Sequence, residues 1–425
     1  MAKEIEEKKN RRKFFAHVKT KRTAKREQID DENSNVIEVT PGISARVKVL
    51  IVILVILIAA VVIVSVRRYI NTREYQGYNV VSSVETNGDN IADYIMFSDN
   101  VLKVTKDGVA YIDATGNTVW DCSYAMKMPQ AVVNGDYAAV ADMNGRDVYV
   151  FNKSGEVSNQ TLNYDIANID IASQGVYVVI LSGENENYIT AYDKDSKEIY
   201  EMKTSIENSG YPLDIAVSDD GQKLFTSYVK VDGTTVPDYL AAYNFGSVGQ
   251  NENADRLMGG FTFDDTIFPY VDFIDNDTIA CFGDDRIVIY SMNEKPSEKA
   301  EISLDGREML GVFANSHYVG YISANADTTA GRYHIYIYDT NGKLTAEADY
   351  NNTFSKIYAT EDELIIAGEF DCSIYYLNGA KKFSTTFRKN LIDIVPSGNK
   401  LEYIAIFENE TTIIKLTMKN EKENK

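Results

Sequence analysis

Cysteine, tryptophan, histidine and proline are scarce in this chain of 425 residues, which contains three cysteines, one tryptophan, three histidines and seven prolines. Three cysteines cannot form a disulfide framework, and their odd number leaves at least one of them unpaired within the chain. The histidines are His17, His317 and His334, too few and too scattered for a histidine-based metal site or a Ser-His-Asp nucleophile. The sequence therefore predicts no metal-binding and no catalytic residues, and a fold that is held by packing alone.

Positive charge is also in short supply. The chain has 43 Lys+Arg against 63 Asp+Glu and a net charge of -20, and the deficit lies after residue 68, since residues 69–425 carry 28 basic and 55 acidic residues. Such an acidic domain is unlike a nucleic-acid-binding domain, so nucleic acid is not an expected partner of this region. Neither a GxxxxGK[ST] motif nor a strand-linked GxGxxG motif occurs, and the sequence predicts no nucleotide cofactor.

One long apolar run interrupts the polar N-terminal region. Residues 49–66 (VLIVILVILIAAVVIVSV) contain no charge, and as a helix they would reach about 27 Å, close to the thickness of the bilayer hydrocarbon. A core helix should show a polar face, and a signal peptide has an apolar stretch of about 7 to 15 residues before a small-residue cleavage site. Neither pattern is present, so the sequence predicts a retained single transmembrane helix at 49–66, followed by a linker at 67–77.

The charge around this run bears on its orientation. Close to the run the basic residues are nearly balanced, with Arg46 and Lys48 before it and Arg67, Arg68 and Arg73 after it. The whole segment 1–48, however, carries 13 basic and 8 acidic residues and is short enough for its charge to oppose translocation. The prediction is a basic cytoplasmic tail at 1–48, partly helical or disordered, and a large domain on the extracytoplasmic side of the cell membrane.

The densest positive charge lies within this tail. Residues 11–26 (RRKFFAHVKTKRTAKR) hold eight basic side chains and no acidic one. Such a segment can rest on anionic lipid or touch nucleic acid, but charge runs also occur as solvated topology signals. Both interpretations stay open from the sequence.

An internal repeat organises the chain after residue 77. A β-branched or aromatic run that ends before a polar turn recurs eight times, as in DVYVFNKSG (147–155) and HIYIYDTNG (334–342), with spacings of 38 to 51 residues. Partner runs before and after each one give about four antiparallel strands per unit, which is typical of a propeller blade. The sequence predicts an all-β, eight-bladed β-propeller at 78–418 and a polar tail at 419–425. Seven blades are the alternative if the long insert at 246–260 makes the fourth blade irregular.

The eighth predicted hairpin lacks an outer strand, because the residues after it are polar. Residues 78–84 (YNVVSSV) read as a strand without a partner. We therefore expect this N-terminal strand to pair with the last hairpin and close the ring, which would satisfy an otherwise open sheet edge.

Two segments carry a resemblance to known repeats. GVAYIDATGNTVWD (108–121) resembles the repeat of pyrroloquinoline-quinone-type eight-bladed propellers, and DIAVSDDGQKLF (214–225) is similar to the inner strand and turn of WD-like propellers. The whole layout looks like an uncharacterised membrane-anchored family of Gram-positive anaerobic bacteria, which implies topology and fold but no activity. Quinone-dependent enzymes of that fold need a tryptophan floor for the cofactor, whereas Trp120 stands on a predicted outer strand. No cofactor residues are carried over, and no cofactor is predicted.

Acidic residues recur at similar places in five of the predicted innermost strands. These residues are Asp93, Asp170, Asp214, Asp272 and Asp393. They could line the central channel as a ring that binds a cation or a cationic ligand, or each could bond the backbone of the next blade and fix blade docking. A further acidic segment at 193–198 resembles part of a calcium loop, but it lacks the glycine at the sixth position and is better explained as a turn.

The predicted function rests on the fold and on the lack of a recognisable active site. We expect a membrane-tethered, extracytoplasmic scaffold that binds a protein or a cell-envelope polymer without catalysis. The alternative is a propeller enzyme, either a carbohydrate hydrolase or a dehydrogenase, that works through channel-facing carboxylates.

Overall fold

The computed structural model describes residues 45–418, apart from residues 71, 86–91, 99, 114, 208, 232, 234, 253–254, 294, 327–328 and 330. The chain divides into two compact units, residues 1–66 and residues 67–425. The predictions for residues 1–44, including the basic segment 11–26, and for the tail at 419–425 lie outside the described residues.

The first described element is a single long helix, α2 (Ala45–Ile70). Within it, Arg46–Val66 has a mean hydropathy of 3.7, and this stretch is long and apolar enough to cross a membrane. None of the stretch is buried, unlike the core helix of a soluble protein. The predicted span at 49–66 lies inside this helix.

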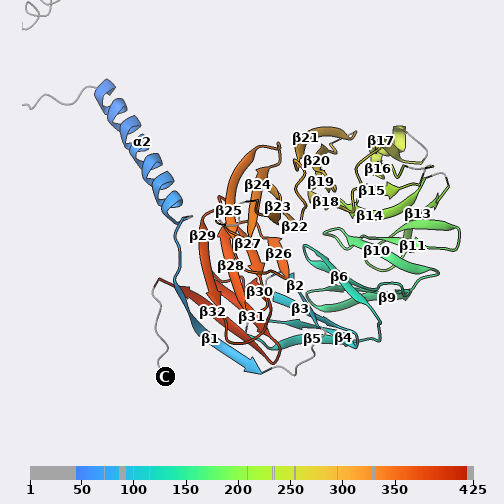
Figure 1. Cartoon of the computed structure of the whole chain (residues 1–425), viewed down its shortest axis with the longest axis horizontal. Helices are drawn as coiled ribbons and strands as arrows, with labels where there is room; N and C mark the ends of the chain where they lie inside the picture. The colour runs from blue at the N-terminus through green and yellow to red at the C-terminus, as the bar shows by residue number, and fades with distance from the viewer. Residues whose placement is uncertain are drawn as a thin grey trace, which may run out of the picture. The chain divides into compact units, whose positions relative to one another are not determined.

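The second unit is an eight-bladed β-propeller of four-stranded antiparallel sheets (Figure 1). In blades 1 to 7 four consecutive strands pair in chain order, the first of them innermost. Blade 1 is formed by β2 (Asp93–Phe97), β3 (Asn100–Thr105), β4 (Gly108–Ile112) and β5 (Thr118–Ser123), and blade 2 by β6 (Pro129–Asn134), β7 (Tyr137–Asp142), β8 (Asp147–Asn152) and β9 (Gly155–Thr161). Blade 3 is formed by β10 (Asp165–Ile171), β11 (Tyr177–Ser182), β12 (Glu186–Tyr192) and β13 (Glu198–Ser205), and blade 4 by β14 (Tyr211–Val217), β15 (Lys223–Val229), β16 (Asp238–Asn244) and β17 (Leu257–Phe263). Blade 5 is formed by β18 (Tyr270–Asp275), β19 (Thr278–Phe282), β20 (Arg286–Ser291) and β21 (Ser297–Ser303). Blade 6 is formed by β22 (Gly311–Ala314), β23 (Tyr318–Ala324), β24 (Tyr333–Asp339) and β25 (Leu344–Tyr350). Blade 7 is formed by β26 (Lys356–Ala359), β27 (Glu363–Ala367), β28 (Asp371–Tyr376) and β29 (Lys381–Thr386).

Blade 8 combines strands from both ends of the propeller. It contains β30 (Leu391–Pro396), β31 (Glu402–Phe407) and β32 (Glu410–Thr417), and its outermost strand is β1 (Gly77–Glu85). β1 runs antiparallel to β32, with Gly77 opposite Thr417 and Glu85 opposite Glu410. The pairing predicted for residues 78–84 with the last hairpin is therefore present, and Figure 1 shows the blue β1 beside the red β32.

The eight sheets decide the blade count in favour of eight. The insert at 246–260 contains the short helix α3 (Ser247–Glu252), and the chain then forms β17 as a regular outer strand of blade 4. The insert enlarges a connection within this blade and leaves its four strands intact.

Burial follows the position of each strand within its blade. In β7 the side chains of Ala138, Ala139 and Val140 are fully buried, because a middle strand is covered on both faces by neighbouring blades. In the outer strand β25 exposed and partly buried residues alternate, as expected where only one face is covered. This is why the middle strands read as continuous apolar runs and the outer strands as mixed ones.

The core is divided among the blade junctions. Eight clusters of buried apolar residues are present in the described chain, and each joins one pair of neighbouring blades. The cluster between blades 4 and 5 contains large side chains such as Phe225 and Tyr290. The cluster between blades 8 and 1 is the smallest, with Tyr94, Val101, Val395, Ile404 and Ile406 as its buried members. The junction that brings the two ends of the propeller together is thus the least packed.

The turns between the third and fourth strands of several blades share one hydrogen-bond arrangement, in which an Asp side chain accepts from two backbone N–H groups. Asp193 Oδ1 accepts hydrogen bonds from the backbone N–H groups of Asp195 at 3.0 Å and Lys197 at 2.9 Å. Asp113 and Asp339 make the same pair of bonds in blades 1 and 6. The acidic segment at 193–198 is therefore a hydrogen-bonded turn, in agreement with the turn interpretation.

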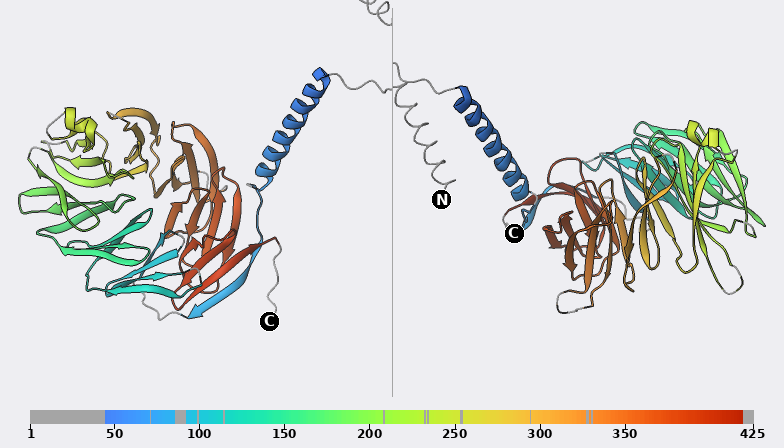
Figure 2. Two further views of the ribbon diagram at one scale, coloured as in Figure 1. Left: turned by 180° about the vertical axis from the view of Figure 1, so that it is seen from behind. Right: turned by 90° about the horizontal axis from the view of Figure 1, so that it is seen from above.

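The two faces of the propeller differ in which ends of the strands they carry (Figure 2). The innermost strands begin on one face, here called the mouth face, at residues such as Asp93, Tyr211 and Lys356. The turns from first to second strands lie on the opposite face, here called the linker face. The pairing of Gly77 with Thr417 makes the chain enter the propeller on the linker face, because β32 ends there.

Candidate functional site

The central channel contains a cavity on the side of blades 1, 6, 7 and 8. Its volume is about 570 Å³, and its walls come from β2, β22, β26, β30 and the residues just before them. Most of the lining is apolar, including Met96, Val312, Ile357 and Val395. A cavity of this size and composition falls within the range that binds small molecules or a few side chains.

Lys356 is the basic residue among those that line this cavity. Its Nζ lies 2.7 Å from Asp93 Oδ1 and 2.9 Å from Asp393 Oδ2, so it connects blade 7 to blades 1 and 8. The Asp393 side chain is 3% exposed, whereas the Asp93 side chain is 66% exposed. Burial alone would lower the pKa of Lys356, but the carboxylates of Asp393 and Asp93 outweigh it and raise this pKa. The ammonium group is therefore held in its charged form between two acids.

Three of the predicted acids lie on the other side of the channel, in blades 3, 4 and 5. Burial raises the pKa of Asp170 to about 6, that of Asp214 to about 7 and that of Asp272 to about 8. At Asp214 the charge of Asp170 adds to the effect, and at Asp272 both other carboxylates add to it. The three groups therefore share one electrostatic environment and ionise close to neutral pH.

Two of these carboxylates also hold neighbouring blades together. The backbone N–H of Val217 in blade 4 donates to Asp170 Oδ2 at 2.7 Å, and that of Val271 in blade 5 donates to Asp214 Oδ2 at 2.7 Å. Asn168 Nδ2 donates to the other oxygen of Asp214 at 2.5 Å. These contacts match the blade-docking interpretation at two of the five positions.

The strand registers explain which acids are equivalent. A bulge lies just before Asn168 in β10, just before Asp214 in β14 and just before Asp393 in β30. The residue that corresponds to Asp214 and Asp393 in blade 3 is thus Asn168, and Asp170 lies two positions further along. One extra residue shifts the alternation of a strand, and sequence spacing alone does not reveal such a shift.

The five predicted acids are therefore brought together as two groups. Asp93 and Asp393 meet at Lys356, and Asp170, Asp214 and Asp272 form a separate group across the channel. Lys356 itself was not predicted, because its partners are 37 and 263 positions away in the sequence. Its place at the start of an innermost strand, where four other blades begin with Asp or Tyr and none with a basic residue, is the signal that would have pointed to it.

Exposed apolar side chains stand where four innermost strands begin. They are Met128, Tyr211, Tyr270 and Leu310, with exposed fractions between 37% and 56%. Leu310 also lines the channel cavity, and the acids Asp214 and Asp272 influence the ionisation of Tyr270. The mouth face therefore has an apolar rim, which we call the mouth rim, above an acidic channel.

A second hollow of about 930 Å³ lies on the linker face, over blades 7 and 8. It borders a buried polar group in which Lys382 contacts Glu363 and donates to Tyr403 at 2.8 Å, while the Tyr403 hydroxyl donates to Glu363 at 2.5 Å. Lys382 is 5% exposed, and burial together with Glu363 raises the pKa of Tyr403 far above its ordinary value. Every member has a partner within the group, so it acts as a connection between the two blades.

The chain enters the propeller beside this group. The Tyr75 N–H donates to Lys382 O at 2.7 Å, and the Tyr376 hydroxyl donates to Arg73 O at 3.0 Å. The linker face is therefore partly covered by the residues that lead into β1, whereas the mouth rim lies at the other end of the innermost strands.

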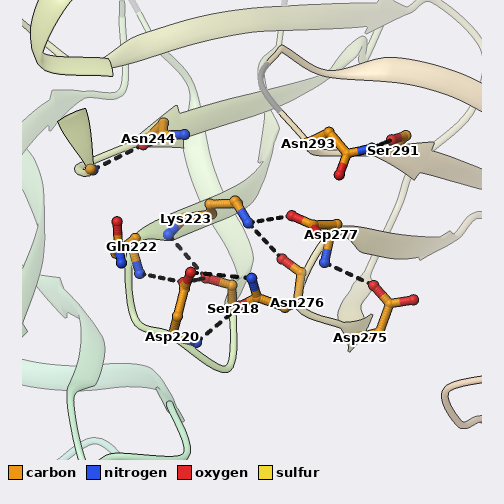
Figure 3. A network of polar contacts seen from close by, with 11 residues as sticks. Ser218, Asp220, Gln222, Lys223, Asn244, Asp275, Asn276, Asp277, Ser291 and Asn293 are labelled. Carbon is orange, nitrogen blue, oxygen red and sulfur yellow. Dashed lines mark hydrogen bonds and ion pairs between the residues drawn. The ribbon is translucent and has the colours of Figure 1, made fainter. Parts of the chain in front are cut away.

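The linker face is also where blades 4 and 5 are joined by a polar network (Figure 3). Lys223 Nζ donates to Asn276 O at 2.9 Å and to Asp277 Oδ1 at 2.5 Å, and Asp220 and Asn276 exchange two hydrogen bonds. The network involves the turn after β14, within the segment that is similar to WD-like repeats. Its polar groups contact one another, which gives the network a structural role.

Residues that could bind a metal ion do not converge in the described part of the chain. No group of three or more His, Cys, Asp or Glu residues there is placed to hold a metal ion. His317 lies in the turn before β23, whereas His334 lies within β24 between Asp349 and Glu347. Cys281 and Cys372 are buried in blades 5 and 7.

Two solved structures show a fold similar to that of this chain. The chain is similar to BamB from Moraxella catarrhalis, with a TM-score of 0.52, 10% identity, and coverage of 80% of this chain and 100% of that one. It is also similar to the C-terminal WD40 domain of Sif2, with a TM-score of 0.54, 10% identity, and coverage of 81% and 99%. At such low identity these likenesses bear on the fold alone.

The sequence comparisons give a family and no activity. No curated protein matches the chain. The model of a family of unknown function, DUF5711, matches residues 71–416, which is nearly the whole propeller with its linker. The chain therefore belongs to this family, DUF5711.

Proposed function

We propose that this chain is a non-catalytic, membrane-tethered propeller that docks a protein partner on the extracytoplasmic side through the mouth of its central channel. The observation that carries the proposal is the combination of the mouth rim with the apolar channel cavity of about 570 Å³. Exposed apolar groups around a concave site are typical of recognition surfaces.

The proposed membrane tether is supported by α2 and by the charge of the preceding tail. An apolar stretch of this length is costly to leave in water and fits the bilayer hydrocarbon. The basic segment 1–48 favours a cytoplasmic N-terminus. The acidic propeller is then the part that meets an extracytoplasmic partner. Contact of residues 11–26 with anionic lipid is compatible with this orientation.

The state of the channel acids supports a binding role. Asp170 and Asp214 bond the backbone of the next blade, and Asp393 is paired with Lys356. Groups committed in this way are poor candidates for proton transfer or nucleophilic attack, which need an accessible and positioned atom.

One observation favours the enzyme alternative. Asp272 holds a proton near neutral pH, because its pKa is raised to about 8 by burial and by Asp170 and Asp214. A neutral carboxyl group beside ionised ones is the arrangement that glycoside hydrolases use for general acid catalysis. A carbohydrate hydrolase that works through Asp272 is therefore the second candidate.

A cell-envelope polymer is the other class of binding partner. A polar hollow of about 740 Å³ lies over blades 2 and 3, beside the stacked rings of Tyr164 and Tyr188, whose centroids are 4.7 Å apart. Such a surface suits a saccharide, but it lies away from the channel. We place the principal docking site at the mouth, where the apolar area is larger.

Photo-crosslinking in the native host tests this proposal. A photoreactive amino acid is placed at Leu310 or Tyr270 on the mouth rim, and at the exposed outer-strand residues Val119 and Leu344 as matched controls. Discrete protein adducts at the rim positions and fewer at the controls support the proposal. Absence of rim-specific adducts, together with turnover of a saccharide panel that is lost in Asp272→Asn, would establish the enzyme instead.

Topology is tested separately on intact cells by added protease. Cleavage of the propeller with protection of the N-terminal tail is expected. Cleavage of the tail with protection of the propeller would contradict an extracytoplasmic docking site.

A further inference from the structure

The charge of the channel restricts what can enter it. Of the cavity-lining residues that the structure describes, Lys356 alone is basic, and it is already bound by Asp93 and Asp393. These three groups together carry one net negative charge, and Asp170, Asp214 and Asp272 stand across the channel. Residues 69–425 have 28 basic and 55 acidic residues, so the field of the whole domain has the same sign.

The two partners of Lys356 differ in how accessible they are. Asp393 is almost completely buried and compensates the ammonium charge from inside the protein. The Asp93 side chain is 66% exposed and stands at the first position of β2, on the mouth face. A group that enters from the mouth therefore meets the carboxylate of Asp93 while Lys356 keeps its buried partner. A cation gains from this contact, whereas an anion would have to displace a carboxylate from Lys356.

The lining of the cavity determines which groups must stand next to the cationic group of the ligand. The rim residue Leu310 and the lining residues Met96, Val312 and Ile357 offer apolar surface in the same cavity as Asp93. A ligand that matches both features has a cationic group next to apolar ones. Polyanions such as nucleic acid or acidic polysaccharide do not fit this charge, and the apolar lining would leave a hydrated inorganic cation poorly coordinated.

We infer that the channel mouth binds a segment of the partner protein in which a Lys or Arg side chain is flanked by apolar residues, with the cation at Asp93 and its neighbours on the mouth rim. The inference rests on the proposed docking function and deepens it by naming the chemistry of the docked segment. The channel mouth is not covered by the described residues of the linker, because the chain enters the propeller on the opposite face, where Tyr75 and Arg73 contact blade 7.

The test measures peptide binding to the full chain in nanodiscs of neutral phosphatidylcholine, so that lipid charge does not attract the peptide. The probes are nine-residue fluorescent peptides with Leu-Arg-Leu, Leu-Glu-Leu or Ser-Arg-Ser at the centre, and fluorescence anisotropy is the readout. We expect the Leu-Arg-Leu peptide to bind at least tenfold more tightly than either of the others. Its affinity should fall as salt is raised, since the contact is partly electrostatic.

Two variants locate the site. Asp93→Asn removes the exposed charge and should weaken the Leu-Arg-Leu peptide at least threefold, and Leu310→Ser should weaken it as well. Asp136→Asn is the matched control, because Asp136 is an exposed aspartate in a turn on the linker face, with a side chain 69% exposed. It changes the net charge by the same amount and should leave binding unchanged.

The outcomes separate this inference from the proposed function. Equal binding of the Arg and Glu peptides, equal effects of Asp93→Asn and Asp136→Asn, or no saturable binding up to about 1 mM, which corresponds to about -4 kcal/mol, overturns the inference. Rim-specific crosslinks in cells would still stand and would keep the docking function. Peptide binding with no crosslinks in cells would instead remove the docking function.

Discussion

The two sides of the channel solve the problem of buried charge in different ways. Beside blades 7, 8 and 1, Lys356 compensates Asp393 and Asp93, and the apolar cluster between blades 8 and 1 has only five buried members. Beside blades 3, 4 and 5, three carboxylates share the channel with no basic partner among the described residues, and the cluster between blades 4 and 5 has eleven buried members. At the thinly packed junction of blades 8 and 1, a lysine compensates the charge of the buried carboxylate. At the extensively packed junction of blades 4 and 5, the raised pKa values of the carboxyl groups keep them partly neutral instead.

This difference indicates separate roles for the two groups. A network of Lys356 with two acids adds connections among three blades at the junction where the ends of the propeller meet. The acids of the other side raise the electrostatic free energy of the folded state as they ionise, and the packing of blades 4 and 5 offsets that cost. Variants that remove one feature at a time therefore test the comparison directly.

The largest effect is expected from Lys356→Met. It leaves the buried Asp393 without its counter-charge. Loss of one partner of a buried pair costs about 3–5 kcal/mol, and we expect the lower end of this range, about 3 kcal/mol, because the Lys356 side chain is 33% exposed. The free energy of unfolding of the full chain in detergent is measured with denaturant, followed by the fluorescence of Trp120, the single tryptophan, whose ring stacks on Tyr111 and Phe151.

Two further variants control this measurement. Lys153→Met breaks an exposed ion pair with Asp136 and should change the free energy of unfolding by less than about 1 kcal/mol. Adding Asp393→Asn to Lys356→Met should recover much of the loss, because the uncompensated charge is gone. Equal losses in Lys356→Met and Lys153→Met would mean that the pair near the channel contributes no more than a surface pair.

The next largest effect is expected at Asp214, which connects blade 4 to blade 5 on the opposite side of the channel from Lys356. Asp214→Ala leaves the buried N–H of Val271 and the amide of Asn168 without their acceptor, at a cost of about 1–3 kcal/mol. Asp214→Asn keeps an acceptor and should cost less. Measuring at about pH 5.5, below the raised pKa of about 7, keeps the native carboxyl largely neutral and isolates the hydrogen bond. Equal losses in the two variants at this pH would contradict a stabilising role for the hydrogen bonds that Asp214 accepts.

A smaller effect appears as a change of pH dependence. The pKa of Asp272 is raised to about 8, so the folded state binds the proton more tightly than the unfolded chain. The stability it contributes is complete at low pH and is lost as the pH rises from about 4 towards 8. Asp272→Asn should therefore be more stable than the parent at pH 8, by at least about 1 kcal/mol, and should flatten the decline.

The control for this pH dependence is Asp121→Asn, which changes an exposed aspartate on the outer strand β5. Its profile should follow that of the parent. A parent protein whose free energy of unfolding rises steadily from pH 4 to pH 8 would contradict the assignment of unfavourable ionisation to the channel acids.

Much of the fold was accessible from the sequence because each blade repeats one local pattern. The runs before polar turns identified the third strands, and the unpaired run at 78–84 identified the partner of β32. The helix α3 was not predicted, since its six residues are too few for a 3.6-residue period to show.

The site was less accessible, for physical reasons that particular residues illustrate. Asp214 and Asp393 were correctly placed on innermost strands, but the bulge in β10 gives their position in blade 3 to Asn168. Lys356 and Asp93 are 263 residues apart, and only closure of the blades into a ring brings them within 2.7 Å. Local pattern predicts strands, whereas pairing of charges across a channel depends on register and on the number of blades.

The smallest effect uses the two buried cysteines as local probes of the two sides. Cys281 in blade 5 and Cys372 in blade 7 are both fully buried, so a thiol reagent reaches them only when the surrounding strands open. In a Cys122→Ser background, labelling at each position is followed by peptide mass spectrometry at pH 5 and pH 8. The ionisation of an opened thiol rises with pH in the same way at both sites and cancels in the ratio of the rates. Ionisation of the channel acids destabilises blades 3 to 5 alone. We therefore expect the ratio of the Cys281 labelling rate to the Cys372 labelling rate to rise about threefold or more between pH 5 and pH 8. A change of this size corresponds to a fraction of one pKa unit, since a whole unit is a factor of ten in an equilibrium constant. Asp272→Asn should reduce that rise, and a ratio that does not depend on pH would show that the two sides of the channel respond to ionisation as one.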